Sequence, residues 1–153
     1  MLAGPSKIFV FLLLLASTAY CQEAVRFALL PGREARAASH LCSRRAPRVD
    51  GGWEPSKANI ESLEAHLSDI AKLRSFSGVV GARIADPSNY YRQYVGILVG
   101  KRKLIYVNAF GTPPFPRWRE RFAWTCDGGV NDWGALYDPR NHRFFRLATN
   151  VNW

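Results

Sequence analysis

The chain has 153 residues, with 21 Lys and Arg against 12 Asp and Glu, which gives a formal net charge of +9 at pH 7. This length is enough for one modest domain and too short for two well-packed ones. Aromatic residues make up 13% of the chain, a content that excludes a disordered or low-complexity protein. No internal repeat is visible, which excludes a solenoid or a propeller. The composition predicts a basic globular protein and points to no specific biochemical activity.

The first 21 residues differ in composition from the rest of the chain. They contain no Asp or Glu, one early cation at Lys7, and an apolar run from Ile8 to Ala16. About nine apolar residues are too few for a transmembrane helix, which needs roughly 20. The pattern is typical of a secretory signal peptide, and no later apolar stretch is long enough to span a membrane. Residues 1–21 therefore predict export to the periplasm or the extracellular space.

Two cleavage positions fit the small residues that follow the apolar run. Cleavage after Ala19 keeps Cys21 in the mature chain, whereas cleavage after Cys21 removes it. A lipid anchor on Cys21 is an alternative, which Tyr20 disfavours because bacterial lipoproteins carry a small residue before the acceptor cysteine. A buried N-terminal helix is the remaining alternative, and the abrupt change to polar residues argues against it.

The cysteines predict one disulfide. Thiols of an exported protein tend to pair, and loss of Cys21 with the signal peptide leaves Cys42 and Cys126 as the pair. A catalytic Cys126 would need a base in a recognisable nucleophile motif, and none is seen near the three histidines, His40, His66 and His142. There is no Cys-x-x-Cys or His-x-x-x-His spacing, so we expect no metal and no cofactor, and we interpret His66 as a partly exposed helix residue.

Residues 22–50 are predicted to form a basic, flexible leader. Their apolar residues show no helical or strand period, and small residues separate six arginines, Arg26, Arg33, Arg36, Arg44, Arg45 and Arg48. Such an arm is usually a solvated linker, with a binding arm as the alternative. A single folded domain is expected over residues 51–153.

One amphipathic helix follows at the start of that domain. Ser56 is suited to cap it, because its hydroxyl accepts a hydrogen bond from backbone N–H groups of the first turn. Apolar residues then recur at steps of three and four, which predicts a single buried stripe made of Ile60, Leu63, Leu67, Ile70 and Leu73. We expect the helix to end before Gly78.

The rest of the chain is rich in aromatic and β-branched residues, which favour strands. A hairpin is predicted from residues 90–99 and 103–110, with its turn at Gly100–Arg102 and a Pro-rich loop after it. Further strands are expected at 121–126, 133–137 and 144–149. The fold class is therefore α+β, with one helix packed on a four- or five-stranded antiparallel meander, and a cystatin-like arrangement matches this order of elements.

Several short motifs resemble those of a family of small, signal-peptide-bearing bacterial proteins with no assigned activity. The motifs are Gly51-Gly52-Trp53, Tyr91-Arg92-Gln93-Tyr94-x-Gly96, Ile105-Tyr106-Val107-Asn108-Ala109-Phe110, Cys126-Asp127-Gly128-Gly129 and Trp133-Gly134-x-x-Tyr137-Asp138. The resemblance covers roughly residues 51–150. It implies a bacterial exported protein and transfers no catalytic residue.

Basic side chains are the strongest candidates for a functional surface. Two groups stand out, and they consist of Arg117, Trp118, Arg119 and Arg121 after the Pro-rich loop, and of Lys101, Arg102 and Lys103 at the predicted hairpin turn. The last hairpin adds Arg140, Arg143 and Arg146. Arginine binds carboxylate and phosphate groups in bidentate fashion. The plainer alternative is that these cations only solvate the strands and discourage aggregation.

We therefore expect an exported, non-enzymatic binding module that recognises an acidic protein or an anionic envelope polymer. An inhibitor of a secreted enzyme, a structural envelope component and a small envelope hydrolase are the alternatives. The hydrolase would use carboxylates such as Glu120 and Asp127, although nothing in the sequence sets their separation. Calcium is not expected, because the spacing of Asp127, Asp132 and Asp138 does not match an EF-hand loop. No nucleic acid is expected as a partner.

Overall fold

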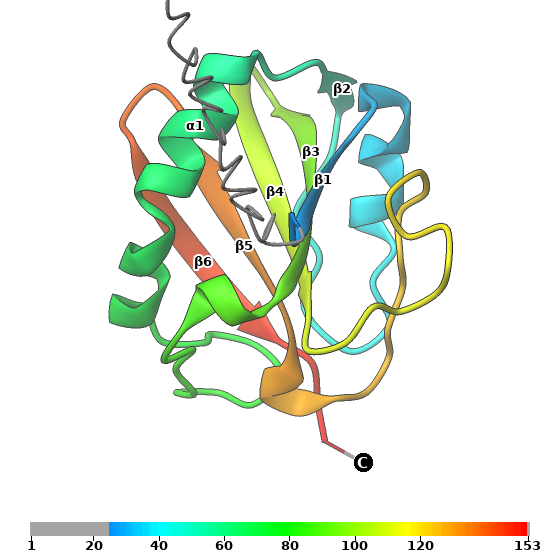
Figure 1. Ribbon diagram of the computed structural model, residues 1–153, viewed down its shortest axis with the longest axis vertical. Coiled ribbons are helices and arrows are strands. Elements are labelled where there is room, and N and C mark those ends of the chain that lie inside the picture. Colours follow the sequence, from blue (N-terminus) through cyan, green and yellow to red (C-terminus); the bar gives the residue numbers. More distant parts are fainter. Residues whose placement is uncertain (1–24, 153) are drawn as a thin grey trace, which may run out of the picture.

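The computed structural model describes residues 25–152, so the signal peptide predicted at residues 1–21 lies outside the described part (Figure 1). Its strands are β1 (Phe27–Leu30), β2 (Gly51–Trp53), β3 (Tyr91–Val99), β4 (Arg102–Phe110), β5 (Asp132–Asp138) and β6 (Arg143–Thr149). The helices are α1 (Lys57–Ala65) and four 3-10 segments, η1 (Gly32–Ser39), η2 (Leu67–Lys72), η3 (Pro87–Asn89) and η4 (Gly129–Asn131). No helix within residues 25–152 is long and apolar enough to cross a membrane.

The predicted hairpin forms the centre of the sheet. Strands β3 and β4 pair antiparallel over their full length, from Tyr91 opposite Phe110 to Val99 opposite Arg102. Strand β5 pairs with β4, and β6 pairs with β5, both antiparallel. The strands expected at 133–137 and 144–149 are thus confirmed as β5 and β6, each slightly longer than predicted.

Within the segment predicted as a flexible leader, Phe27–Leu30 belongs to the same sheet, so the prediction is wrong for this part. Strand β1 pairs parallel with β3, with Phe27 opposite Arg92, and β2 pairs antiparallel with the other half of β3. Leu30 is fully buried. The parallel pairing of β1 makes the sheet mixed, so the predicted antiparallel meander is corrected, while the α+β class is confirmed. The cystatin-like arrangement is not confirmed.

Helix α1 and segment η2 cover one face of the sheet, which is the near face in Figure 1. Ser56 caps α1 as predicted, because its Oγ accepts a hydrogen bond from the Asn59 N–H at 3.3 Å. The apolar stripe packs on the sheet through Ile60, Leu63, Leu67 and Ile70, all buried. The helix breaks at its C-cap residue, and the stripe continues in η2, so the single long helix of the prediction is two shorter segments.

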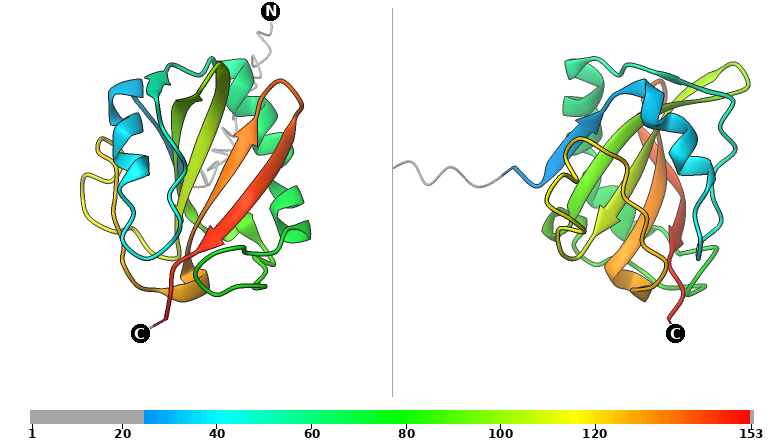
Figure 2. Two further views of the ribbon diagram at one scale, coloured as in Figure 1. Left: turned by 180° about the vertical axis from the view of Figure 1, so that it is seen from behind. Right: turned by 90° about the vertical axis from the view of Figure 1, so that its right-hand side faces the viewer.

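The opposite face of the sheet is covered in part, on the side of β1 to β3, as the rear view in Figure 2 shows. Segment η1 buries Ala35 and Ala38 there, and Phe122 of the connection between β4 and β5 packs beside them. The strand predicted at 121–126 is a loop, because its N–H groups bond to side chains instead of a ladder. The N–H of Phe122 donates to Glu34 Oε2 at 3.1 Å, and that of Ala123 donates to Gln93 Oε1 at 3.0 Å.

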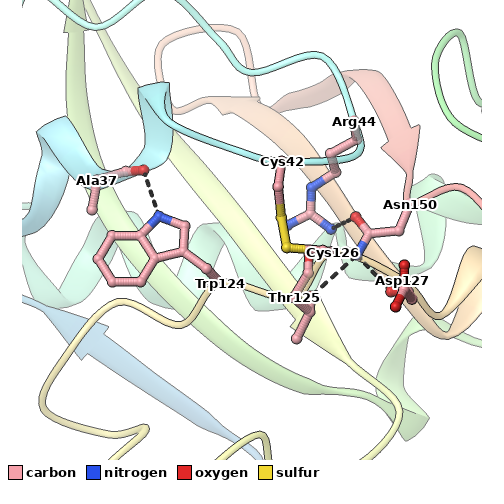
Figure 3. The surroundings of a disulfide bond; sticks show 8 residues. All are labelled: Ala37, Cys42, Arg44, Trp124, Thr125, Cys126, Asp127 and Asn150. Atoms are coloured by element: carbon pink, nitrogen blue, oxygen red, sulfur yellow. Dashed lines mark hydrogen bonds between the residues drawn. A yellow bond between two sulfur atoms is a disulfide. The ribbon is translucent and has the colours of Figure 1, made fainter.

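The predicted disulfide between Cys42 and Cys126 is confirmed (Figure 3). Its Cα atoms are 5.2 Å apart, and 84 residues separate the two cysteines. The bond joins the chain after η1 to the loop before η4. The two segments that cover the second face, η1 with the chain after it and the connection between β4 and β5, are therefore covalently linked.

A buried arginine lies beside this disulfide. Arg44 is 5% exposed, and its guanidinium donates hydrogen bonds to Tyr106 Oη at 3.2 Å, to Asn150 Oδ1 at 3.0 Å and to Asn108 Oδ1. Asn150 in turn donates to the carbonyl oxygens of two residues on either side of Cys126, Thr125 and Asp127, each at 2.8 Å (Figure 3). The cation is thus satisfied by neutral groups that also fix the loop.

Asn108 extends this network to the Pro-rich loop. Its side-chain N–H groups donate to Gln93 Oε1 at 3.0 Å and to the Ala123 carbonyl at 2.9 Å. Gln93 donates to the carbonyls of Trp118 and Arg121. Asn108 and Gln93 are fully buried, so these bonds replace lost hydration and hold the loop on the sheet.

Candidate functional site

A cavity lies between two hairpin turns at one end of the sheet. Its volume is about 780 Å³. One wall is the β3–β4 turn and the other is the β5–β6 turn, which lies next to α1 at the upper left of Figure 1. We call it the hairpin-turn cleft, and its lining consists of Trp53, Asn59, Lys101, Arg102, Lys103, Asp138, Pro139, Arg140, Asn141 and Arg143.

The first wall is held in place by a carboxylate outside the cleft. Gly100 adopts φ +59°, a left-handed conformation that glycine accepts without strain, and its N–H donates to Asp50 Oδ2 at 2.6 Å. This bond, with a smaller contribution from Arg48, holds the pKa of Asp50 below its usual value. The turn therefore presents Lys101 and its neighbours toward the cleft from a fixed backbone.

The second wall is organised by Asp138, whose side chain is 5% exposed. Its Oδ1 accepts hydrogen bonds from the backbone N–H groups of Arg140 at 3.0 Å and Asn141 at 3.4 Å. Its Oδ2 accepts from the Asn141 side chain at 2.9 Å and from Arg102 at 3.0 Å. Asp138 thus binds the two turns to each other and neutralises Arg102.

The remaining cations of the cleft have no carboxylate partner. Lys101, Lys103, Arg140 and Arg143 are exposed, and none of them forms an ion pair within residues 25–152. The ammonium of Lys103 lies 5.4 Å from the centre of the Trp53 ring, whose Nε1–H donates to the Leu104 carbonyl at 2.9 Å. The cleft therefore combines uncompensated positive charge with one fixed aromatic ring.

The second predicted group does not form a comparable surface. Trp118 is 4% exposed, so it is a core residue. Arg117 pairs with Glu120, which lowers the pKa of that carboxyl, and Arg119 stacks on the Trp118 ring at 4.2 Å while it donates to the Val25 carbonyl. Only Arg121 of this group is exposed without such a partner among residues 25–152.

The structure thus divides the predicted basic surface into two separate places. The loop of Arg117 lies at the right of Figure 1, away from the β5–β6 turn at the upper left. The predicted Lys101–Lys103 group meets Arg140 and Arg143 in the cleft, as the pairing of β4 with β5 requires. Trp53 and Asn59 were not predicted to line a site. Because Glu120 is engaged by Arg117, the carboxylate-pair hydrolase gains no support and stays a prediction.

The charge of Asp138 makes a testable contribution to stability. Burial alone raises its pKa, but hydrogen bonds from Asn141, Arg102 and two backbone N–H groups outweigh this effect, and the pKa lies below its usual value. A carboxyl with a lowered pKa in the folded state stabilises it above the unfolded-state pKa, and this contribution is lost as pH falls below about 4.

We therefore expect Asp138→Asn to lower the free energy of unfolding by about 1–2 kcal/mol at pH 7, because the amide nitrogen cannot accept from Arg102. Urea unfolding at pH 7, 5 and 3 measures this difference. The gap between wild type and variant should shrink between pH 5 and pH 3, and a gap that stays constant over this range would contradict the assignment.

The motifs that carry the family resemblance occupy structural positions. They fall in β2, β3, β4 and β5 and at the disulfide cysteine of the last loop. They therefore describe the core of the fold, and the resemblance itself stays a prediction. No protein-family model, curated protein or solved structure matches this chain.

Proposed function

We propose that this protein is an exported, non-enzymatic binding module that holds an anionic partner in the hairpin-turn cleft. One observation carries this proposal: four cations from two hairpins surround a single cavity, and none of them is neutralised within residues 25–152. Like charges gathered in this way repel one another, so a ligand that brings negative charge is favoured. The one lining carboxylate, Asp138, is already engaged by Arg102 and the turn, so it does not neutralise these four cations.

Export is part of the proposal. The disulfide between Cys42 and Cys126 supports it, because such bonds persist in oxidising compartments and are rare in the cytosol. The predicted signal peptide at residues 1–21 also supports export. The partner is therefore sought outside the cytoplasm, in the periplasm or beyond the cell.

The chemistry of the cleft favours a partner with several carboxylate or phosphate groups in a row. Arg140 and Arg143 offer bidentate donors, Lys101 and Lys103 offer point charges, and Trp53 adds an apolar surface to the lining. An acidic protein segment and an anionic envelope polymer both present this chemistry. Exposed charges bind more weakly as salt rises, so the interaction should depend strongly on ionic strength.

The chain offers a matched pair of variants for the test. A cleft variant carries Lys101→Ala, Arg140→Ala and Arg143→Ala, and a control variant carries Arg117→Ala, Arg119→Ala and Arg121→Ala. Both remove three positive charges. Calorimetric titration with poly-L-glutamate and with short-chain polyphosphate at low and moderate salt compares them, and we expect affinity at least tenfold lower for the cleft variant and within about threefold of wild type for the control.

Two results would contradict the proposal. Equal losses in the two variants would mean that binding follows net charge and has no site. If the wild-type protein binds neither polyanion at low salt, an anionic partner is ruled out. Which polyanion binds more tightly then distinguishes carboxylate from phosphate chemistry.

A further inference from the structure

Two histidines that are distant in the sequence meet beside the hairpin-turn cleft. His66 is the C-cap residue of α1, and His142 belongs to the turn between β5 and β6. Their ring centroids are 5.7 Å apart and their planes differ by 24°. No sequence spacing reveals this pair, because the fold alone brings the helix end to the hairpin turn.

A single serine of α1 holds both rings by the same ring nitrogen. The His66 Nδ1–H donates to the backbone carbonyl of Ser62 at 2.8 Å, and His142 Nδ1 lies 2.7 Å from Ser62 Oγ. Ser62 Oγ also lies 2.8 Å from the hydroxyl of Tyr137, a buried residue. Either hydroxyl can be the donor in the hydrogen bond between Ser62 and Tyr137.

The bond of His66 determines which of its ring nitrogens is left for a ligand, and the bond of His142 allows the same nitrogen to be left. A carbonyl oxygen only accepts, so the neutral His66 ring carries its proton on Nδ1 and its lone pair on Nε2. In the His142 tautomer that carries its proton on Nδ1, this nitrogen donates to Ser62 Oγ and the Nε2 lone pair is available in the same way. Histidines that bind metal ions are usually held in this manner, with the second ring nitrogen donating to a carbonyl or another polar group.

The backbone at His142 adds an independent observation. This residue has φ +49°, one of two non-glycine residues with positive φ within residues 25–152. Such a conformation is uncommon and persists where the surrounding structure imposes it, often at functional positions. Here it lies in the turn that Asp138 fixes, so the exposed His142 ring is presented by a rigid support.

We propose that His66 and His142 form a two-imidazole site for a divalent transition-metal ion of the Cu²⁺, Ni²⁺ or Zn²⁺ class. The Nε2 atom of each ring is the ligand, and water or an anion from the neighbouring cleft completes the coordination. Imidazole nitrogens suit these ions, whereas Ca²⁺ and Mg²⁺ require oxygen ligands. Within residues 25–152 no cluster of three or more His, Cys, Asp or Glu side chains can hold a metal, so the site has two protein ligands.

The alternative use of these groups is nucleophilic catalysis by Ser62 with His142 as base. That chemistry needs donors for a developing oxyanion, and the nearby backbone N–H groups of Arg140 and Asn141 already donate to Asp138. Ser62 is also held by both Tyr137 and His142. These contacts suit a residue that positions two ligands.

The chain has only three histidines, which makes the test clean. Untagged protein is titrated with Cu²⁺, Ni²⁺, Zn²⁺ and Ca²⁺ by calorimetry at pH 7.5, and Cu²⁺ coordination is followed by electron paramagnetic resonance. We expect one Cu²⁺ per chain, weaker binding of Ni²⁺ and Zn²⁺, and no binding of Ca²⁺. His66→Ala and His142→Ala should each weaken Cu²⁺ binding at least tenfold, and the matched control His40→Ala should leave it unchanged.

Two further measurements separate this site from other sources of binding. Ser62→Ala keeps the carbonyl that holds His66 and removes the hydroxyl that holds His142, so we expect about tenfold weaker Cu²⁺ binding. In wild-type protein, sub-stoichiometric Cu²⁺ should broaden the imidazole NMR signals of His66 and His142 before those of His40. Equal effects of the three histidine variants, or broadening of His40 first, would overturn the proposal. The NMR experiment decides the matter even if a variant does not fold.

Discussion

Replacing Cys42 and Cys126 together by serine is expected to lower the free energy of unfolding by about 4–5 kcal/mol. The disulfide closes a span of 84 residues, and a cross-link over so long a loop removes much of the entropy of the unfolded chain. It also joins the two segments that cover the second face of the sheet, neither of which contains a long helix or strand. A loss of this size is a large part of the stability of an ordinary domain.

Urea unfolding of the double variant and of wild type, each with and without reductant, measures this contribution. Reductant should lower the midpoint of wild type toward that of the variant and leave the variant unchanged. A difference below about 1 kcal/mol between variant and oxidised wild type would show that the covering layer is stable without its covalent link.

The second large effect is expected at Asn108. Asn108→Leu removes one of the three acceptors of the Arg44 guanidinium and the donor to Gln93 and to the Ala123 carbonyl, while the buried cation remains. Breaking a buried charged network on one side typically costs about 3–5 kcal/mol. We expect a loss in this range, with detachment of the loop that Gln93 holds.

The double variant Arg44→Met with Asn108→Leu is the matched control for this prediction. It removes the buried charge together with its acceptor, so a substantial part of the lost stability should return. Chemical denaturation of both variants measures the two effects. If Asn108→Leu alone lowers the free energy of unfolding by less than about 1 kcal/mol, Arg44 is hydrated or finds another acceptor. The hydrogen bonds of Asn108 then do not hold the loop after β4 on the sheet.

The parts of the fold that sequence patterns predicted depend on local interactions. The apolar alternation of residues 90–99 and 103–110 places Val95 and Ile97 on one face and Tyr94 on the other, and this pattern specifies β3, β4 and the turn between them. The Ser56 cap and the apolar stripe after it are also local. The disulfide was predictable from the parity of the cysteines in a chain predicted to be exported.

The parts that sequence patterns missed depend on distant partners. Strand β1 has only four residues and no alternation, and its pairing partner lies in β3, so nothing in residues 22–50 indicates it. Phe122 and Ala123 lie in a stretch whose residue types favour a strand. Their N–H groups donate to the side chains of Glu34 and Gln93, so they cannot bond to a neighbouring strand. Arg44 looked like one more solvated arginine and is buried because three neutral acceptors surround it.

The candidate site shows the same division. Lys101 to Lys103 were predicted at a hairpin turn, which is where they lie, whereas their meeting with Arg140 and Arg143 follows from the β4–β5 pairing. Trp118 was predicted to be part of a surface because it lies among arginines, and it is instead buried against Tyr91. Charge patterns thus located the cations, and only the fold shows which of them share a cavity.

The parallel pairing of β1 with β3 has a consequence for biogenesis. A ribosome delivers the N-terminal segments first, yet Phe27–Leu30 can find its place only after Tyr91–Val99 has emerged. Until then this short apolar segment is exposed and unpaired, and such segments are prone to aggregation and are bound by chaperones. The pairing of β1 therefore has to follow the synthesis of β3, more than 60 residues later in the chain.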